Sequence, residues 1–260
     1  MSRFHRPHWR RPHLGGRLVY GLGTGLVAAF LAVFSRFRIA RLRSQQRVAS
    51  NLPDGPIIVI ANHTSYLDGL LLAFVARRFG RTLRMLATAG VFRIPVVGSL
   101  ARTVGFIPVD RRGPDPARAL EPAIHALAHG EAVGLFPEGR ITRHRDHWPE
   151  RARTGMVRLA LRSGAPVVPV AMVGAHRVVP RRRIISRTML NAVLRPDVAV
   201  VVGRPIDVVS LIPVDARDDG PEDADALRMV TDQVMGELVS LVERLRASSA
   251  PDPSGVELTE

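Results

Sequence analysis

The sequence predicts an α/β protein in which a mixed sheet is covered by helices and preceded by an apolar helical extension. Two observations predict this class. Short apolar runs of strand length alternate along the chain with longer stretches that repeat apolar residues at helical spacing. A basic and strongly apolar segment precedes this alternation, and a length of 260 residues fits one such domain with an extension.

The predicted strands are short, continuous and rich in β-branched residues, as in strands that are buried on both faces. They lie at residues 57–61, 104–109, 132–136, 167–173 and 198–202. Stretches with helical spacing lie at residues 65–79, 116–129, 154–163 and 224–246. The last of these is amphipathic, with Leu227, Val230 and Val234 on one face, and is expected to pack on the core or to face a partner.

Composition divides the chain into three parts. Residues 1–48 form a basic segment that contains the apolar run 18–34. Residues 49–246 hold the alternating pattern and are expected to form one folded domain. Residues 247–260 are rich in Ser, Pro and Gly, so we expect a disordered tail.

The apolar run 18–34 is predicted to associate with a membrane. All 37 basic residues are arginine, and the first 53 residues hold ten of them with no carboxylate. Seventeen uncharged residues are at the short limit of the ~17–25 that cross a bilayer. Arginines on both sides favour a helix that lies at, or dips into, an anionic leaflet. A cleaved signal peptide and an ordinary buried helix are the alternatives, although no small-residue cleavage site precedes Arg36.

The remaining charge also indicates a membrane surface rather than nucleic acid. Arg177, Arg187 and the run 180–183 are expected to form a patch that faces anionic lipid. A sequence pI near 11.6 is typical of nucleic-acid-binding proteins, but aromatic residues make up only 5% and no nucleic-acid motif occurs. The chain has no cysteine, which is compatible with a domain at the inner face of the cytoplasmic membrane.

A histidine at the end of the run 57–61 is the first candidate for catalysis. His63 precedes Asp68 by five residues, and helical spacing begins at Leu67, so His63 is expected on a strand-to-helix turn. From such a turn the ring can reach an Asp side chain that leans toward the helix N-terminus. The His-x4-Asp spacing therefore predicts a general base with its orienting acid. A buried histidine capped by a helix carboxylate is the structural alternative.

Three later segments combine a strand-like run with chemical residues at its end. They are Gly-Phe-Ile-Pro-Val-Asp-Arg-Arg at 105–112, Val-Gly-Leu-Phe-Pro-Glu-Gly-Arg at 133–140 and Ala-Pro-Val-Val-Pro-Val-Ala at 165–171. The ends of strands are the usual place for a site in an α/β sheet. We therefore expect these segments to meet the His-x4-Asp turn.

The four motifs in this order resemble the signature of the glycerolipid acyltransferase family, specifically the 1-acyl-sn-glycerol-3-phosphate (lysophosphatidic acid) acyltransferases. The resemblance covers roughly residues 50–205, and four motifs in order are far more specific than one. It implies an acyltransferase that moves a fatty acyl group from acyl-CoA or acyl-carrier protein to the hydroxyl of lysophosphatidate, giving phosphatidate. It also implies that His63 is the base and Asp68 its partner.

The resemblance further implies five substrate-binding residues. Arg111 would bind the phosphate, Glu138 and Gly139 would form part of the acceptor pocket, and Pro169 would shape the acyl-donor side. Family members usually continue the third motif with Thr-Arg-Ser after the glycine, whereas here Arg140 follows directly. Arg140 or Arg143 would then supply the charge, and an acceptor with another lipid hydroxyl remains the alternative.

The implied chemistry needs a base but no covalent intermediate. A hydroxyl attacks poorly until its proton is removed, and here the substrate hydroxyl would replace the serine of a hydrolase triad. Helix N-terminal amides just after His63 are expected to stabilise the oxyanion.

Other catalytic schemes find no support in the sequence. The absence of cysteine excludes a cysteine acyl-enzyme, and no Gly-x-Ser-x-Gly elbow occurs. The run 144–147, His-Arg-Asp-His, lies among arginines that would repel a cation, so no metal site is expected. The glycines at 21, 23 and 25 lack the dinucleotide-binding spacing and no Walker motif occurs, so no cofactor is expected. A non-catalytic basic protein that binds a membrane surface or nucleic acid is the alternative of another class.

Overall fold

Eight strands form one sheet in the part of the chain that the computed structural model describes, which is residues 14–40, 52–109, 118–180, 184–212, 223–249 and 258–259. The strands are β1 (Arg36–Ala40), β2 (Ile57–Ala61), β3 (Leu83–Thr88), β4 (Ile107–Val109), β5 (Ala132–Leu135), β6 (Val167–Val173), β7 (Asp197–Val202) and β8 (Leu258–Thr259). The α-helices are α1 (Leu14–Phe34), α2 (Asp68–Arg78), α3 (Pro95–Thr103), α4 (Glu121–Ala128), α5 (Gly155–Ser163), α6 (Ala175–Val178), α7 (Ile184–Leu194) and α9 (Ala224–Ser249). Short 3-10 turns are η2 (Val91–Arg93), η3 (Arg118–Leu120) and η4 (Val209–Leu211).

The sheet is mixed, with the order β4-β3-β5-β2-β6-β7-β1-β8. The five strands from β4 to β6 are parallel, so their carboxyl ends share one edge. β7 is antiparallel to β6, and β1 is parallel to β7. The turns after β2, β4 and β5 therefore leave the sheet at the same edge, where a site of an α/β sheet is usually built.

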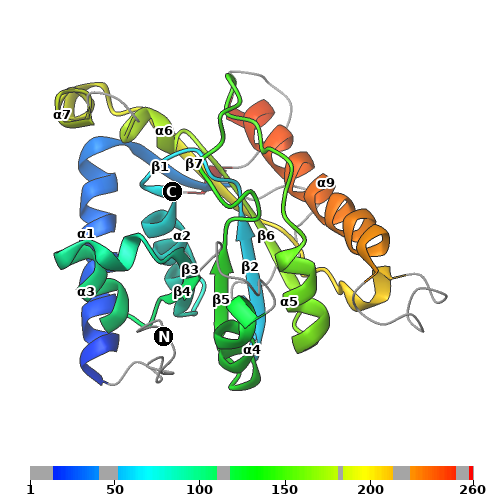
Figure 1. Cartoon of the computed structure of the whole chain (residues 1–260). Helices are drawn as coiled ribbons and strands as arrows, with labels where there is room; N and C mark the ends of the chain where they lie inside the picture. Colours follow the sequence, from blue (N-terminus) through cyan, green and yellow to red (C-terminus); the bar gives the residue numbers. More distant parts are fainter. Residues whose placement is uncertain are drawn as a thin grey trace.

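Helices cover the sheet on both faces, with α1, α2 and α3 on one side and α4, α5 and α9 on the other (Figure 1). Strand β2 shows how the two layers are filled. Val59 and Ala61 belong to the core beside α1 and α2, whereas Ile58 and Ile60 belong to the core beside α5 and α9. Successive side chains of a strand point to opposite faces, so a strand between two helical layers is apolar at every position.

The apolar N-terminal helix is part of the folded domain. Ser35 alone separates α1 from β1, and β1 pairs with β7 inside the sheet. The Tyr20 hydroxyl donates a hydrogen bond to the Ala73 carbonyl at 3.0 Å and accepts one from the Leu83 amide at 3.1 Å. Strand β1, which belongs to the predicted segment 1–48, thus lies in the same sheet as the strands of the predicted domain 49–246. The predicted boundary between residues 48 and 49 lies outside the described residues. Arginines alternate with apolar residues in β1, so residues 36–40 form a strand and are not simply a charged flank.

The predicted class, a mixed α/β sheet covered by helices, is confirmed. Four predicted strands match β2, β5, β6 and β7 within one residue at each end. The run 104–109 is shortened, because the chain turns at Gly105 with φ 77° before β4 begins. The helix predicted at 116–129 becomes η3 followed by α4, and residues 116 and 117 lie outside the described part.

The disordered tail predicted from residue 247 is corrected in part. Helix α9 continues to Ser249, and β8 pairs antiparallel with β1, with Ile39 opposite Thr259. Residues 250–257 and 260 lie outside the described part. No proline occurs between residue 224 and Pro251, so the helix can continue past residue 246. Strand β1 offers an edge whose free backbone groups accept another strand.

Candidate active site

A histidine–aspartate pair lies at the carboxyl end of β2, as the His-x4-Asp spacing predicts. The His63 Nδ1 atom lies 3.0 Å from Asp68 Oδ2. Asp68 is fully buried at the first turn of α2, while the His63 side chain retains 18% of its exposure. The turn between β2 and α2 therefore brings the two side chains together and leaves part of the imidazole accessible.

The surroundings of the ring fix its orientation and its tautomer. Phe136, which follows β5, stacks on His63 with ring centroids 4.0 Å apart and an interplanar angle of 12°. An ionised Asp68 can only accept hydrogen bonds, so Nδ1 of His63 must donate the one between them. The other nitrogen, Nε2, then carries the lone pair. This is the arrangement that a general base requires.

The expected oxyanion donors after His63 are engaged elsewhere. The amides of Thr64 and Ser65 both donate to Asp68 Oδ2, at 2.5 and 2.7 Å. The predicted oxyanion role is therefore excluded for these two amides. Asp68 is the first residue of α2, and its carboxylate accepts both hydrogen bonds from the turn that precedes the helix. The same two bonds hold the carboxylate beside His63.

Glu138 connects the His63 turn to the loop after β5. Its side chain is only 5% exposed, and its Oε1 accepts a hydrogen bond from the His63 amide at 2.9 Å. Its Oε2 accepts one from the Glu150 amide, also at 2.9 Å. Burial raises the pKa of Glu138, and the hydrogen bonds from the two amides oppose this effect. Both carboxylate oxygens thus accept hydrogen bonds from backbone amides. The next residue, Gly139, adopts a φ of 72°, which a glycine allows without strain.

Residues 140–150 form a loop that folds back on the same turn. The Thr142 amide donates to the His63 carbonyl at 2.7 Å, and the Thr142 hydroxyl donates to the Trp148 carbonyl at 2.7 Å. The Arg140 guanidinium binds Glu150 Oε2 through two nitrogens, at 2.6 and 3.1 Å. Arg140 is therefore paired within its own loop, with 52% of its side chain exposed.

The end of α9 reaches this loop from the other layer of helices. Arg246 donates to the carbonyls of Asp146 and His147 at 2.7 and 3.1 Å, and its guanidinium lies 4.2 Å from the centre of the Trp148 ring. His147 stacks on His176 with ring centroids 3.9 Å apart. Burial first, and then the positive charges nearby, lower the pKa of His176 to about 4. The loop beside His63 is thus held at two points.

Comparison with known proteins identifies the family. A family model described as Acyltransferase matches residues 43–173, just over half of the chain, and the match includes His63, Asp68, Glu138 and Pro169. The chain belongs to the acyltransferase family. The resemblance of its four motifs to the glycerolipid acyltransferases is thereby confirmed.

Individual relatives of this acyltransferase agree with the family model. The chloroplastic 1-acyl-sn-glycerol-3-phosphate acyltransferase BAT2 of Brassica napus is 30% identical over 159 residues, which cover 60% of this chain and 43% of that protein. The 1-acyl-sn-glycerol-3-phosphate acyltransferase of Borreliella burgdorferi is 31% identical over 126 residues, or 48% of each chain. The chain thus spans less than half the length of these relatives.

A solved structure supports the fold of this acyltransferase. The crystal structure of the 1-acyl-sn-glycerophosphate acyltransferase PlsC from Thermotoga maritima matches with a TM-score of 0.59 at 22% identity. The match covers 92% of this chain and 81% of that chain. At this identity the likeness concerns the fold.

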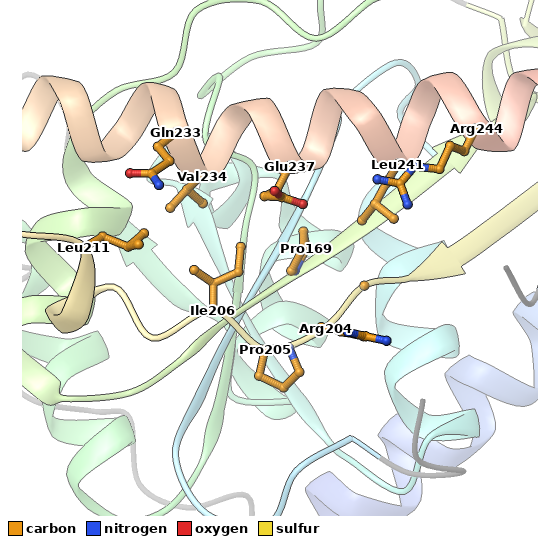
Figure 2. Close-up of a pocket in the computed structure, with 11 residues that line it drawn as sticks. Pro169, Arg204, Pro205, Ile206, Leu211, Gln233, Val234, Glu237, Leu241 and Arg244 are labelled. Carbon is orange, nitrogen blue, oxygen red and sulfur yellow. The ribbon is translucent and has the colours of Figure 1, made fainter. Parts of the chain in front are cut away.

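Arg111 and Pro169 are the remaining residues predicted to bind substrate in the acyltransferase. Arg111 lies outside the described residues, two positions in the sequence after the end of β4. Pro169 lines a cavity of about 460 Å³ between the sheet and α9, with Ile206 and Glu237 (Figure 2). None of the other predicted site residues in the described part lines that cavity. Their substrate contacts remain predictions.

Several residues that join the loops of this acyltransferase are not among the predicted site residues. Phe136 and Glu150 are the main examples, since one supports the His63 ring and the other bridges Arg140 to the Arg143 amide. Phe136 lies in the third motif, two residues before Glu138, so its position was a usable signal. Glu150 lies twelve residues beyond Glu138 in a loop without periodicity, and nothing local marks it.

The described residues of the acyltransferase hold no group of three His, Asp or Glu side chains that could bind a metal ion. His147, which belongs to the run 144–147, stacks on His176.

Proposed function

We propose that this protein transfers a fatty acyl group from an acyl thioester to the free hydroxyl of lysophosphatidate, giving phosphatidate. The observation that carries the proposal is the hydrogen bond between His63 Nδ1 and Asp68 Oδ2, which leaves Nε2 as a base. The names of the relatives from Brassica napus and Borreliella burgdorferi support the choice of acceptor.

The reaction proceeds by direct transfer. His63 Nε2 takes the proton of the acceptor hydroxyl as its oxygen attacks the thioester carbonyl. Asp68 stabilises the imidazolium that forms and keeps the ring in place. The tetrahedral intermediate collapses, the carbon–sulfur bond breaks, and the imidazolium returns its proton to the leaving thiolate. An ester and a free thiol result, and His63 is neutral again.

An acyl-serine route is disfavoured by the state of the nearest serine. Ser65 is fully buried, and its hydroxyl donates to the Val179 carbonyl at 2.8 Å. It also accepts a hydrogen bond from the Leu67 amide. A nucleophilic serine needs a base beside a free hydroxyl, and the hydroxyl of Ser65 is committed to main chain.

For the acceptor phosphate, Arg111 is the proposed ligand, because a planar guanidinium binds a phosphate with two parallel hydrogen bonds. Arg140 is the weaker candidate, since two nitrogens of its guanidinium already donate hydrogen bonds to Glu150. This pairing favours a second candidate function, transfer to another lipid or lysolipid hydroxyl by the same chemistry. Glu138 and Gly139 would then shape the acceptor pocket by fixing the loop, and Pro169 would act on the donor side.

The reaction would take place at the inner face of the cytoplasmic membrane. Among the described helices, α1 has the length and apolar composition to cross a bilayer. One side of α1 packs on the domain through Tyr20 and Leu31, whereas Leu18 and Leu22 are about 70% exposed on the other. A helix attached along its length to a domain fits an interfacial position better than a crossing. Acyl-CoA and acyl-carrier protein both remain candidate donors.

Acceptor-dependent thiol release tests the proposal. Purified protein in mixed micelles is given acyl-CoA or acyl-carrier protein, with and without lysophosphatidate, and the lipid product is identified by mass spectrometry. We expect thiol release that depends on lysophosphatidate and yields phosphatidate. Release with another lysolipid alone would select the second candidate function.

The His63→Ala variant is the matched control for background hydrolysis. If no thiol is released with either donor across a panel of lysolipids, the proposed enzymatic activity is contradicted and a non-catalytic surface protein is favoured.

A further inference from the structure

Helix α7 has its polar side toward the protein and its apolar side toward the outside. Its buried residues are Thr188 and Asn191. Large apolar side chains are exposed instead, led by Ile185 at 79% and Val193 at 82%. The others are Ile184, Met189, Leu190 and Leu194. An amphipathic helix of a water-soluble domain faces its apolar stripe to the core, so α7 is reversed.

Hydrogen bonds fix α7 in this orientation. The Thr188 hydroxyl donates to the Val178 carbonyl at 3.1 Å, and the Asn191 amide group donates to the carbonyls of Arg177 and Val178 at 2.9 and 3.0 Å. Rotating the helix to bury its apolar side would break all three bonds and leave buried carbonyls without donors, which costs free energy. The exposed apolar side is therefore a fixed property of the fold.

The C-terminal end of α7 is attached to α1. Arg195 donates to the carbonyls of Ala32 and Ser35 at 2.7 and 3.3 Å. Helix α7 therefore lies against the C-terminal end of α1 (Figure 1). The outer side of α1 is also apolar, with Leu26 at 73% and Val33 at 51% exposed. Two neighbouring helices thus expose apolar side chains, and such a patch marks an interaction surface.

The charge around α7 indicates the kind of partner. Residues 177–195 contain six arginines and no carboxylate, and Arg177 and Arg187 are exposed. Arginine next to apolar side chains matches a surface that is negative outside and apolar within, as an anionic lipid leaflet is. Eleven residues extend about 16 Å, so α7 is too short to cross a hydrocarbon core of about 30 Å.

We propose that α7 is a second membrane-docking helix, which lies flat in an anionic leaflet with Ile185 and Val193 among the lipid chains. The proposal rests on the membrane association proposed above and adds a specific, separate contact to it. The lipid surface would cover the apolar side chains that the fold leaves exposed.

Site-specific labelling tests the contact, because the chain has no cysteine and a single introduced one is labelled without background. Val193→Cys carries an environment-sensitive fluorophore, and Met229→Cys, a position 48% exposed on α9, is the matched control. The full chain is mixed with vesicles of phosphatidylglycerol and phosphatidylcholine in equal parts. We expect emission to rise and shift to shorter wavelength at 193 only, with quenching by lipids that carry a shallow nitroxide.

Vesicle flotation measures the energetic contribution of the contact. The double variant Ile185→Asp/Val193→Asp is expected to bind these vesicles at least about tenfold more weakly than the wild type, because each aspartate removes an apolar side chain from lipid. Met229→Asp is expected to bind as the wild type does. Arg187→Ser is expected to weaken binding to the anionic vesicles more than to phosphatidylcholine alone.

The outcomes separate this proposal from the one on which it rests. Wild-type protein that binds neither vesicle would contradict the membrane association itself. If the wild type binds the vesicles and the double variant binds them equally well, the role of α7 is overturned but the membrane association stands. The same holds if the emission of the fluorophore at 193 does not change. A wild-type dimer that becomes a monomer in the double variant, with vesicle binding unchanged, would identify the face as a contact between copies of the chain and would overturn the lipid proposal.

Discussion

Helices α9 and α7 are both amphipathic, but they present opposite sides to the protein. α9 buries Leu227, Val230 and Val234 almost completely in the core and turns its polar side outward. α7 buries Thr188 and Asn191 and turns its apolar side outward. The comparison teaches that a helical period gives the spacing of the apolar side but not the environment that it meets. Contacts made by the rest of the chain decide the direction.

The same division applies to the chemistry. The His63 ring stacks on Phe136, which packs on the core beside α1 and α2. The cavity around Pro169 lies against α9. We therefore compare a substitution on the side of α1 and α2 with one beside α9, and we expect the largest loss of activity on the side of α1 and α2.

His63→Ala is expected to lower acceptor-dependent thiol release about 10²- to 10⁴-fold, the range for loss of a general base. Gln233→Ala, in the cavity beside α9 that also holds Pro169, removes no group of the proposed proton transfer, so turnover at saturating donor is expected to stay near that of the wild type. Circular dichroism would check that both variants are folded. Wild-type turnover in His63→Ala would end the mechanism, and a large loss in Gln233→Ala would move part of the site to the α9 layer.

Glu138→Gln is expected to lower activity about tenfold and the free energy of unfolding by about 1–3 kcal/mol. A glutamine has one acceptor oxygen for the two amides of His63 and Glu150, so its NH₂ group would face a donor. Steady-state kinetics and urea unfolding measure the two effects. Glu121→Gln, which loses a surface pair with Arg162, is the control. Equal behaviour of the two variants would exclude a special role for Glu138.

Arg246→Ala tests whether the α9 layer supports the site at all. The variant loses two hydrogen bonds to carbonyls and the contact with the Trp148 ring, so we expect a loss of about 1–2 kcal/mol in stability and a severalfold loss of activity. Arg244→Ala, whose described hydrogen bonds reach only Ser240, is the control. Denaturant unfolding with parallel kinetics would reveal the difference, and identical variants would show that the end of α9 is irrelevant to the site.

The smallest effect concerns His176. Its pKa falls from 6.5 to about 4 in the folded protein, so the unfolded chain takes up a proton at a pH where the folded protein does not. Its contribution to stability is therefore present above pH 6.5 and is lost as the pH falls toward 4. We expect the stability difference between wild type and His176→Gln to be smaller at about pH 5 than at about pH 7. A constant difference in urea unfolding would contradict this assignment.

The parts that the sequence predicts well are local. Strand β2 and the turn to α2 follow from one apolar run and one spacing, so His63 and Asp68 were predictable together. Strands β5 and β6 are equally apparent, because each is buried on both faces and therefore apolar throughout.

The parts that the sequence hides depend on distant partners. Arg84 lies buried within β3 because Glu131 pairs with it at 2.6 Å, so the strand does not look apolar. Arg36 and Arg38 in β1 are accommodated by Asp197, which lies about 160 residues away in sequence. The inverted side of α7 depends on the carbonyls of residues 177 and 178. In each case the deciding contact is made by residues outside the local sequence, so the local pattern does not predict it.

The single residue between α1 and β1 leaves the N-terminal helix no independent hinge. The Ser35 hydroxyl donates to the Leu31 carbonyl at 2.7 Å, and the strand that follows is hydrogen-bonded to β7. Any surface on which α1 settles therefore sets the tilt and height of the whole sheet. Pulling a lysolipid chain into water costs about 0.8 kcal/mol for each methylene group. A protein held at a fixed tilt and depth on the bilayer would bind the acceptor hydroxyl at the depth that this hydroxyl already occupies. The acyl chain of the acceptor would then stay in the lipid.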